Sequence, residues 1–196
     1  IEPLLRSAAE ESGLHYSQQQ EQAIREAASS GLLLITGGPG TGKTTVLRGI
    51  LNLLGNLQLR YLLAAPTGRA AKRLSEVTGE DASTIHRLLE SGIDPATGKM
   101  AFARDEDNPL KCDAVVVDEM SMVDVLLLSS LLRAIPKGKR LILVGDPDQL
   151  PPVGPGFPFS DMLRSGCLPT VCLTEIFRQA QKSLIVMNAH RVNRGE

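Results

Sequence analysis

The residues with the clearest chemistry lie in a glycine-rich stretch that ends in a lysine and two threonines. Glycines at this spacing let successive backbone N–H groups turn toward a phosphate chain, and a helix behind them adds the positive end of its dipole. Lys43 is then expected to reach the β and γ phosphates, and Thr44 to ligate Mg²⁺. An ordinary glycine-rich turn is the alternative, but the flanking apolar strand and helix favour an ATP site. Its predicted residues are Gly37, Gly38, Pro39, Gly40, Thr41, Gly42, Lys43, Thr44 and Thr45.

Two adjacent carboxylates, Asp118 and Glu119, directly follow the apolar run Val115–Val117. At the carboxyl end of a parallel strand, both acids are expected beside the phosphates. Asp118 is predicted to hold Mg²⁺ through water, and Glu119 to orient or deprotonate the attacking water. Taken alone, such a pair is more often a solvated strand end. Its position after a phosphate-binding loop favours the catalytic interpretation.

Short, nearly continuous apolar runs indicate strands that are covered on both faces. Helical stretches fill most of the gaps between them, and this alternation is typical of a parallel sheet with helices on both sides. We therefore predict an α/β fold with a mostly parallel sheet. The expected strands are Leu32–Ile35, Tyr61–Ala65, Ala114–Val117, Leu141–Val144 and Thr170–Leu173.

Two helix starts can be placed from the sequence. Ser17 and Gln20 form a capping-box pattern, which predicts a helix to about Ala28. A second helix is expected to begin within 42–44. The apolar pattern lapses over 91–109, where we predict a small hairpin insertion whose turn contains Asp-Pro and Thr-Gly.

Composition places limits on the class of protein. The formal net charge of −1 excludes a chain that is strongly basic as a whole, so any nucleic-acid site must be local. No apolar run reaches the length of a membrane span and the first residues lack a signal-peptide pattern, so we expect no membrane association and a cytoplasmic location. The three cysteines, Cys112, Cys167 and Cys172, have no metal-ligand spacing and are predicted to be small apolar fillers.

The order and wording of the motifs resemble those of the RecD-like superfamily 1 DNA helicases, the family of the exodeoxyribonuclease V alpha subunit. The resemblance covers about 16–196, and its motifs are specific. They are Gln20, the phosphate loop Gly37–Thr44, Ala65–Ala71, Ser83–Leu89, Val117–Met122, Gly145–Val153 and Leu173–Gln179.

This resemblance implies a RecA-like P-loop NTPase domain and further nucleotide contacts. Gln20 is expected to read the adenine edge, although it is also a plausible capping-box partner. Phe177 is expected to stack on the base, at a position where relatives often have a tyrosine. Gln149 is expected to sense the γ-phosphate and link hydrolysis to DNA contact. Arg178 is expected to contact the γ-phosphate, with a surface salt bridge as the alternative.

The resemblance also implies single-stranded DNA contacts that bind phosphates without reading sequence. Lys72 and Arg73 share a helix face with Arg69 and either attract DNA or only face solvent. His86 is either a DNA contact or a buried, hydrogen-bonded histidine. The hairpin is expected to meet the duplex junction through Phe102 or Met100, or to be only a connection. The expected DNA-binding residues are Pro66, Thr67, Gly68, Arg69, Thr84 and His86.

The predicted domain organisation follows the same resemblance. Residues 1–16 are expected to lead in from a preceding region, 17–165 to form the ATP-binding motor domain, and 166–196 to carry the last strand toward a second RecA-like domain. That second domain would supply an arginine finger, so this chain alone is expected to hydrolyse ATP slowly. Further expected partners are the subunits of a nuclease-helicase complex, and translocation is expected to run 5′ to 3′.

Two other classes of function stay open at this point. A non-helicase P-loop ATPase would need an acceptor-binding lid or an oligomer interface, and the motifs provide neither. A nucleotide-gated DNA-binding subunit with a silenced motor is disfavoured by the intact Lys43, Thr44, Asp118 and Glu119.

Overall fold

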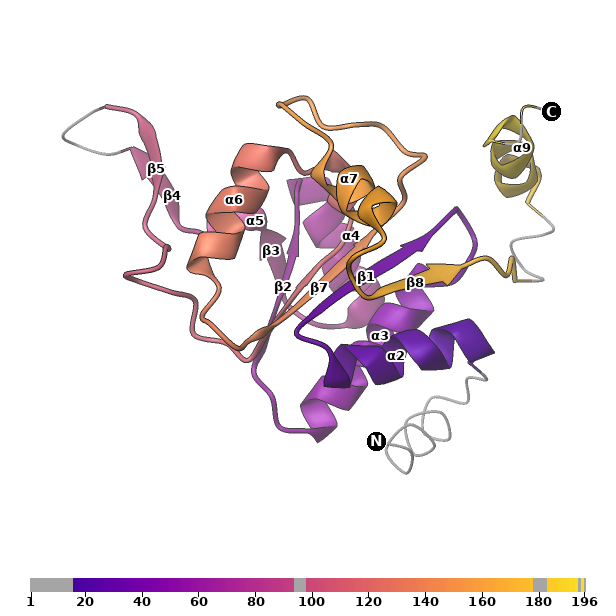
Figure 1. Ribbon diagram of the computed structural model, residues 1–196, viewed down its shortest axis with the longest axis horizontal. Helices are drawn as coiled ribbons and strands as arrows, with labels where there is room; N and C mark the ends of the chain where they lie inside the picture. The colour runs from indigo at the N-terminus through magenta and orange to yellow at the C-terminus, as the bar shows by residue number, and fades with distance from the viewer. Residues whose placement is uncertain (1–15, 94–97, 178–182, 194, 196) are drawn as a thin grey trace.

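The computed structural model describes residues 16–93, 98–177, 183–193 and 195. Its elements alternate between strands and helices, as the sequence predicts (Figure 1). In chain order they are α2 (Gln18–Ser29), β1 (Leu32–Gly37), α3 (Lys43–Asn56), β2 (Tyr61–Ala65), α4 (Gly68–Thr78), β3 (Ala82–Thr84), α5 (Ile85–Leu88), β4 (Ser91–Ile93), β5 (Met100–Phe102), β6 (Ala114–Val117), the 3₁₀ helix η1 (Met120–Met122), α6 (Val125–Ala134), β7 (Arg140–Gly145), α7 (Pro158–Ser165), β8 (Thr170–Leu173) and α9 (Leu184–Asn193).

The main sheet has six strands in the order β3-β2-β6-β7-β1-β8, and every strand pair in it is parallel. The predicted α/β class and parallel sheet are confirmed. All carboxyl ends of the strands therefore open on one edge of the sheet, which is where loops can gather a binding site. The strand β8 pairs with β1, so 170–173 belongs to the same sheet as the predicted motor domain.

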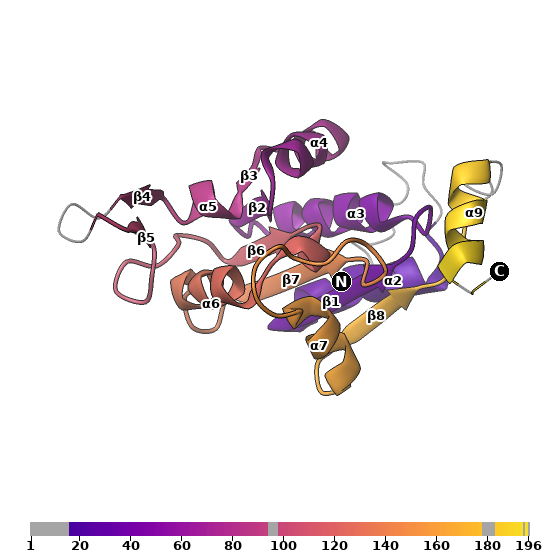
Figure 2. The same ribbon diagram turned by 90° about the horizontal axis from the view of Figure 1, so that it is seen from above.

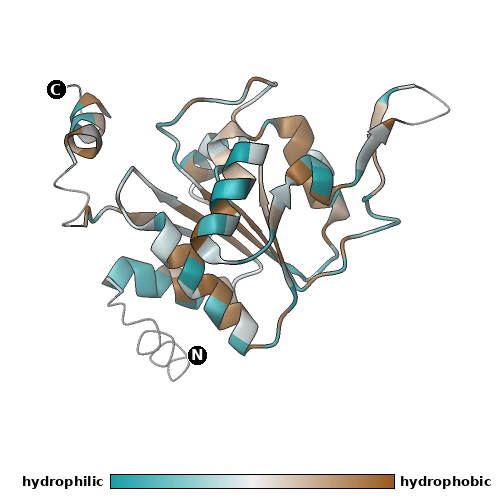
Figure 3. Cartoon of the chain, turned by 180° about the vertical axis from the view of Figure 1, so that it is seen from behind, coloured by the Kyte–Doolittle hydropathy of each residue, from teal (hydrophilic) through white to brown (hydrophobic). Residues whose placement is uncertain are grey.

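Helices cover both faces of the sheet (Figure 2). Along β1, Leu33 and Ile35 pack with α2, α3 and α4, whereas Leu34 packs with α5, η1, α6 and α7. Successive strand residues point to opposite faces, so a strand covered twice must be apolar at consecutive positions. Figure 3 shows the apolar strands behind helices whose outer surfaces carry hydrophilic residues.

The predicted hairpin is present as the antiparallel pair β4 and β5, in which Ile93 lies opposite Met100. Of its predicted turn, residues 94–97 lie outside the described residues, and Gly98 has a φ of +66°. The short strand β3 was missed, because its three residues are only half-buried and lack an apolar run. In the part of the chain that the structure describes, no helix combines the length and apolar character needed to cross a bilayer.

The prediction for the cysteines is partly wrong. Cys112 is buried, but Cys167 and Cys172 are exposed, and all three thiols are free. Cys172 lies in β8, a strand at the edge of the sheet whose residues alternate between exposed and buried, and it occupies an exposed position.

Candidate nucleotide and DNA site

The phosphate loop connects β1 to α3. Gly40 and Gly42 have φ angles of +78° and +83°, a region in which a side chain would be strained. The Thr41 hydroxyl donates to the Gly38 carbonyl over 2.8 Å and fixes the curve of the loop. Helix α3 begins at Lys43, within the range predicted from the sequence. Its amino end and the loop therefore present backbone donors to the same space.

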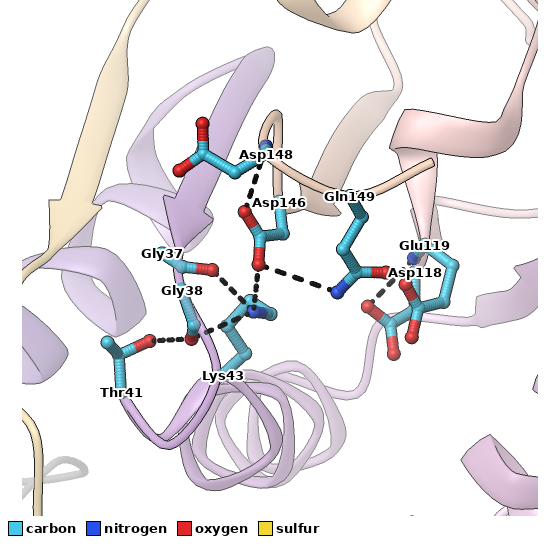
Figure 4. Close-up of polar contacts among 9 residues, drawn as sticks. All are labelled: Gly37, Gly38, Thr41, Lys43, Asp118, Glu119, Asp146, Asp148 and Gln149. Atoms are coloured by element: carbon cyan, nitrogen blue, oxygen red, sulfur yellow. Dashed lines mark hydrogen bonds and ion pairs between the residues drawn. The ribbon is translucent and has the colours of Figure 1, made fainter. Parts of the chain in front are cut away.

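Lys43 lies in a cage of acceptors (Figure 4). Its Nζ donates to the Gly37 carbonyl over 2.5 Å and to the Gly38 carbonyl over 3.2 Å. It also lies 4.0 Å from Oδ2 of Asp146, whose side chain is 2% exposed. Gln149 Nε2 donates to the same Oδ2 over 3.5 Å. Asp146 thus links the ammonium to Gln149, a role that the sequence analysis missed although the residue lies within a quoted motif.

Asp118 and Glu119 follow β6 as predicted. The backbone N–H of Asp118 donates to the Ala64 carbonyl over 3.0 Å, which ties the acid to the end of β2. Glu119 adopts a left-handed φ of +57°, so its N–H donates to Asp118 Oδ1 over 2.9 Å. Burial raises the pKa of the Asp118 carboxyl to about 6, against this hydrogen bond and the nearby charges of Lys43 and Arg73.

Gln20 satisfies the predicted capping box and still has a donor left. Its Oε1 accepts from the Ser17 N–H over 3.0 Å, and Ser17 Oγ accepts from the Gln20 N–H over 3.4 Å. The side chain is buried, and its Nε2 has no hydrogen-bond partner among the described residues. A buried donor without a partner is costly, so this atom fits a ligand acceptor. The two interpretations of Gln20 are therefore compatible.

Phe177 lies against the phosphate loop. Its N–H donates to the Gly40 carbonyl over 3.3 Å, and its ring lies beside Gly42. The ring and the Gln20 amide thus share one end of the site. Arg178 and its predicted γ-phosphate contact lie outside the described residues.

These groups line one pocket of about 930 Å³. Its volume is within the range of small-molecule sites. The sequence analysis did not anticipate the wall that α4 provides. The lining residues are Gln20, Gly38, Pro39, Gly40, Thr41, Gly42, Lys43, Thr44, Thr45, Ala70, Arg73, Leu74, Val77, Asp118, Glu119, Gln149, Phe177 and Val186.

Two of the predicted DNA-contact threonines are helix N-caps. Thr67 Oγ1 accepts from the Ala70 N–H over 3.2 Å at the start of α4, and Thr84 Oγ1 accepts from the Arg87 N–H over 3.1 Å at the start of α5. Ala65 pairs with Thr84 in the parallel β2–β3 register, so both helix starts lie at the same edge of the sheet. Pro66 is half-buried, and Gly68 is exposed.

His86 is half-buried and packs against the hairpin. Its ring centroid lies 5.8 Å from that of Phe102, with the planes tilted by 52°. Phe102 in turn packs on the core cluster beneath α5 and α6. Met100 and Ile93 are instead 71% and 75% exposed. Of the two aromatic or sulfur side chains proposed to meet a duplex junction, Met100 is therefore the accessible one.

The three cations of α4 have different surroundings. Arg69 is exposed, and the Lys72 ammonium lies 3.9 Å from the Glu76 carboxylate. Arg73 lines the nucleotide pocket. The sequence analysis grouped Arg73 with the DNA-facing charges, because spacing alone does not show that one side of α4 closes the ATP site.

Comparison with known proteins gives the family. Residues 20–155 match the family model described as AAA domain. The chain belongs to this family. It is 43% identical over 180 residues to the ATP-dependent RecD2 DNA helicase of Deinococcus radiodurans, a match that covers 92% of this chain and 24% of the relative. The RecD-like resemblance is confirmed.

Two further relatives support the same assignment. The RecBCD enzyme subunit RecD of Mycolicibacterium smegmatis is 41% identical over 169 residues, covering 74% of this chain and 30% of the relative. The structure of Pif1 helicase from Candida albicans has 28% identity and a TM-score of 0.62, over 85% of this chain and 41% of that one. The RecD-like motor domain thus spans less than a third of the curated relatives it matches.

Proposed function

We propose that this domain binds and hydrolyses ATP with Mg²⁺ and couples hydrolysis to translocation on single-stranded DNA and to unwinding of duplex. The observation that carries the proposal is the single pocket that joins the phosphate loop, the Asp118 and Glu119 carboxylates and the buried Nε2 of Gln20. A donor of this kind recognises a base, the loop recognises phosphates, and the acids serve hydrolysis.

In the proposed complex, Gln20 and Phe177 bind the adenine. The Gln20 Nε2 donor faces a ring acceptor of the base, and the Phe177 ring provides an apolar face for stacking. Lys43 leaves the carbonyls of Gly37 and Gly38 and donates to the β and γ phosphates. A triphosphate offers the ammonium charged acceptors, which form stronger hydrogen bonds than neutral carbonyls.

The donor set suits Mg²⁺. Thr44 offers a hydroxyl and Asp118 a carboxylate, and hard oxygen ligands of this kind are typical of Mg²⁺ held together with phosphates. When bound, Mg²⁺ would supply positive charge that neutralises the charge of the phosphates. Among the described residues, His, Cys, Asp and Glu form no cluster of three or more that could hold a metal on its own.

In the proposed hydrolysis step, Glu119 accepts a proton from, or orients, the attacking water. Gln149 is proposed to sense the γ-phosphate, since it lies between Asp146 at Lys43 and the Asp118 and Glu119 pair. The same bond links Gln149 to the ammonium, so a shift of Lys43 toward phosphate releases or moves Gln149. Arg178 is proposed to contact the γ-phosphate as well.

Single-stranded DNA is proposed to cross the starts of α4 and α5, at Pro66, Thr67, Gly68, Arg69, Thr84 and His86. The free hydrogens of the two hydroxyls and the helix-start N–H groups are suitable phosphate donors. We further propose 5′ to 3′ translocation, a second RecA-like domain that supplies an arginine finger, and assembly with nuclease-helicase subunits. Assembly with such subunits is supported by the similarity to a RecBCD enzyme subunit, and the presence of a further domain by the share of the relatives that this chain leaves uncovered.

The proposal is tested by ATPase rates with and without a single-stranded oligonucleotide. The measurements are made on this chain and on the longer polypeptide expected to contain it. We expect this chain to bind ATP and to hydrolyse it slowly, and we expect single-stranded DNA to stimulate ATP hydrolysis by the longer polypeptide. Lys43→Ala should abolish ATP hydrolysis in both proteins. Turnover in the longer polypeptide that ignores DNA would instead identify a non-helicase ATPase, and tight DNA binding without turnover would identify a silenced motor. A forked duplex with a 5′ or a 3′ tail measures polarity.

A further inference from the structure

Helix α4 forms one wall of the nucleotide pocket with a single face. The residues on this wall are Ala70, Arg73, Leu74 and Val77, which follow the i, i+3, i+4, i+7 spacing of one helical stripe. Three of them are apolar, and Arg73 is the one charge. Arg73 is exposed, so its guanidinium is available to an anionic partner in the pocket.

Arg73 has no such partner within the described parts of the chain. Neighbouring Lys72 pairs with Glu76, whereas the Arg73 guanidinium forms neither an ion pair nor a hydrogen bond with the residues that the structure describes. Helix α4 follows β2, and β2 pairs in parallel with β6, the strand that leads into Asp118. Arg73 and Asp118 both line the pocket. Arg73 therefore lies near the end of the pocket that holds Asp118.

The two ends of the pocket can be told apart. Gln20 and Phe177 lie together over Gly42 at the end suited to a base. Asp118 and Glu119 lie at the end suited to metal, water and the last phosphate. A cation at this second end meets an anion that a nucleoside triphosphate has and a diphosphate lacks.

We propose that Arg73 binds the terminal phosphate of a nucleoside triphosphate from within this domain. The inference rests on the proposed ATP site and adds a residue that selects triphosphate over diphosphate. A guanidinium presents parallel N–H donors that match two phosphate oxygens, and it remains charged at all physiological pH values.

The position of Arg73 on α4 adds a link to DNA. It lies six residues after Thr67, roughly 9 Å along the helix at 1.5 Å per residue. One short helix thus carries a proposed DNA phosphate contact at its start and a proposed nucleotide phosphate contact near its middle. Loss of the last phosphate would free Arg73 and remove one restraint on the DNA end.

The test measures dissociation constants of a fluorescent non-hydrolysable ATP analogue and of the matching ADP, both with Mg²⁺. Arg73→Gln is expected to weaken the triphosphate analogue by about tenfold or more, the usual effect of losing a charged hydrogen bond, and ADP by less than about threefold. Arg73→Lys, which keeps the charge but not the paired donors, should fall between. Lys72→Gln makes the same charge change on the same helix outside the pocket and should alter neither constant.

The inference would be overturned if Arg73→Gln weakened the binding of both nucleotides equally, or weakened neither. In that case, ATP binding by the wild-type domain and its loss in Lys43→Ala would show that the proposed ATP site itself still stands. Selective loss of single-stranded DNA affinity with unchanged nucleotide constants would also overturn it and return Arg73 to the DNA face. Failure of the wild-type domain to bind either nucleotide would refute the proposed function itself. Thermal unfolding of each variant distinguishes a local effect from a loss of fold.

Discussion

The side-chain amide of Gln20 lies directly over the Cα atom of Gly42, and a Cβ built on Gly42 would stand 2.4 Å from Nε2. Gln20 cannot retreat freely, because its Oε1 is bonded to the Ser17 N–H. Gly42→Ala is therefore expected to push Gln20 and the Phe177 ring out of place. We predict a nucleotide affinity at least about tenfold weaker, corresponding to roughly 1.4 kcal/mol, measured by titration with a fluorescent ATP analogue.

The left-handed φ of Gly42 would itself strain an alanine, so the effect needs a matched control. Gly79 has a φ of +77° and nothing within 4 Å of a built Cβ. Gly79→Ala should lower thermal stability by about 1 kcal/mol through strain alone and leave nucleotide affinity unchanged. Similar affinities for Gly42→Ala and the wild type would show that the overlap is relieved without cost to the site.

Replacing Gln20 by glutamate tests the buried donor separately from the helix cap. Glu at this third helical position can still accept from the Ser17 N–H, so the capping box persists. The Nε2 donor is lost, and we predict weaker binding of ATP with little change for a triphosphate lacking the adenine base. The ratio of the two affinities measures the effect.

Ser17→Ala is the complementary control for Gln20. It removes the other half of the capping box and should lower stability by about 1 kcal/mol, as typical for a lost N-cap. Its ratio of ATP to base-free triphosphate affinity should match the wild type. A changed ratio would mean that Gln20 is held in position by the cap and not by its own burial.

The strands β2, β6 and β8 have the bounds predicted from sequence. For the central strand β6 the reason is that a strand covered on both faces needs a continuous apolar run, whereas the edge strand β8 is buried only at alternate positions. The start of α3 was predictable for a related reason. A left-handed glycine before Lys43 ends the loop and lets the helix begin. Local constraints of this kind leave a clear pattern in the sequence.

Relationships between distant segments were less predictable. Asp146 contacts Lys43 from another strand, and Arg73 turns toward the pocket only because α4 packs beside α3. Phe102 and Met100 were both candidates to meet a duplex junction, and the sequence did not show that Phe102 packs on His86 and the core whereas Met100 is exposed. Each of these outcomes depends on which face of a helix or strand is covered by neighbouring elements. A single sequence shows the periodicity of its apolar residues but does not show which element packs against them.

Asp113 gives a prediction for pH dependence away from the site. The Lys139 ammonium donates to its Oδ1 over 2.8 Å and the Arg60 N–H to its Oδ2 over 3.0 Å, and these bonds lower the carboxyl pKa from 3.8 to about 2. Between these values the unfolded chain binds more protons, so stability rises with pH. The contribution is fully present above about pH 4 to 5 and is lost as the pH falls through about 2.

Asp113→Asn should therefore destabilise the domain at pH 7 and differ less and less from the wild type as the pH falls from about 4 toward 2. Urea midpoints at a series of pH values provide the measurement. Lys139→Met should show the same pH window, because it removes the first of the two partners. A deficit of Asp113→Asn that stays constant down to pH 2 would assign the loss to packing and not to the charge.

The hairpin of β4 and β5 contains one side chain that packs on the core and two that are exposed, so the two kinds can be tested separately. Phe102 is half-buried against the core, so Phe102→Ala should cost on the order of 1–3 kcal/mol of stability, below the cost of a fully buried phenylalanine. Ile93 and Met100 lie opposite each other and are largely exposed, so Ile93→Ser with Met100→Ser should change stability by less than about 0.5 kcal/mol. If the hairpin meets a duplex junction, this double variant should lose affinity for a forked duplex while keeping its affinity for a single-stranded oligonucleotide. Equal affinity of the double variant and the wild type for the fork would make the hairpin only a connection between α5 and β6.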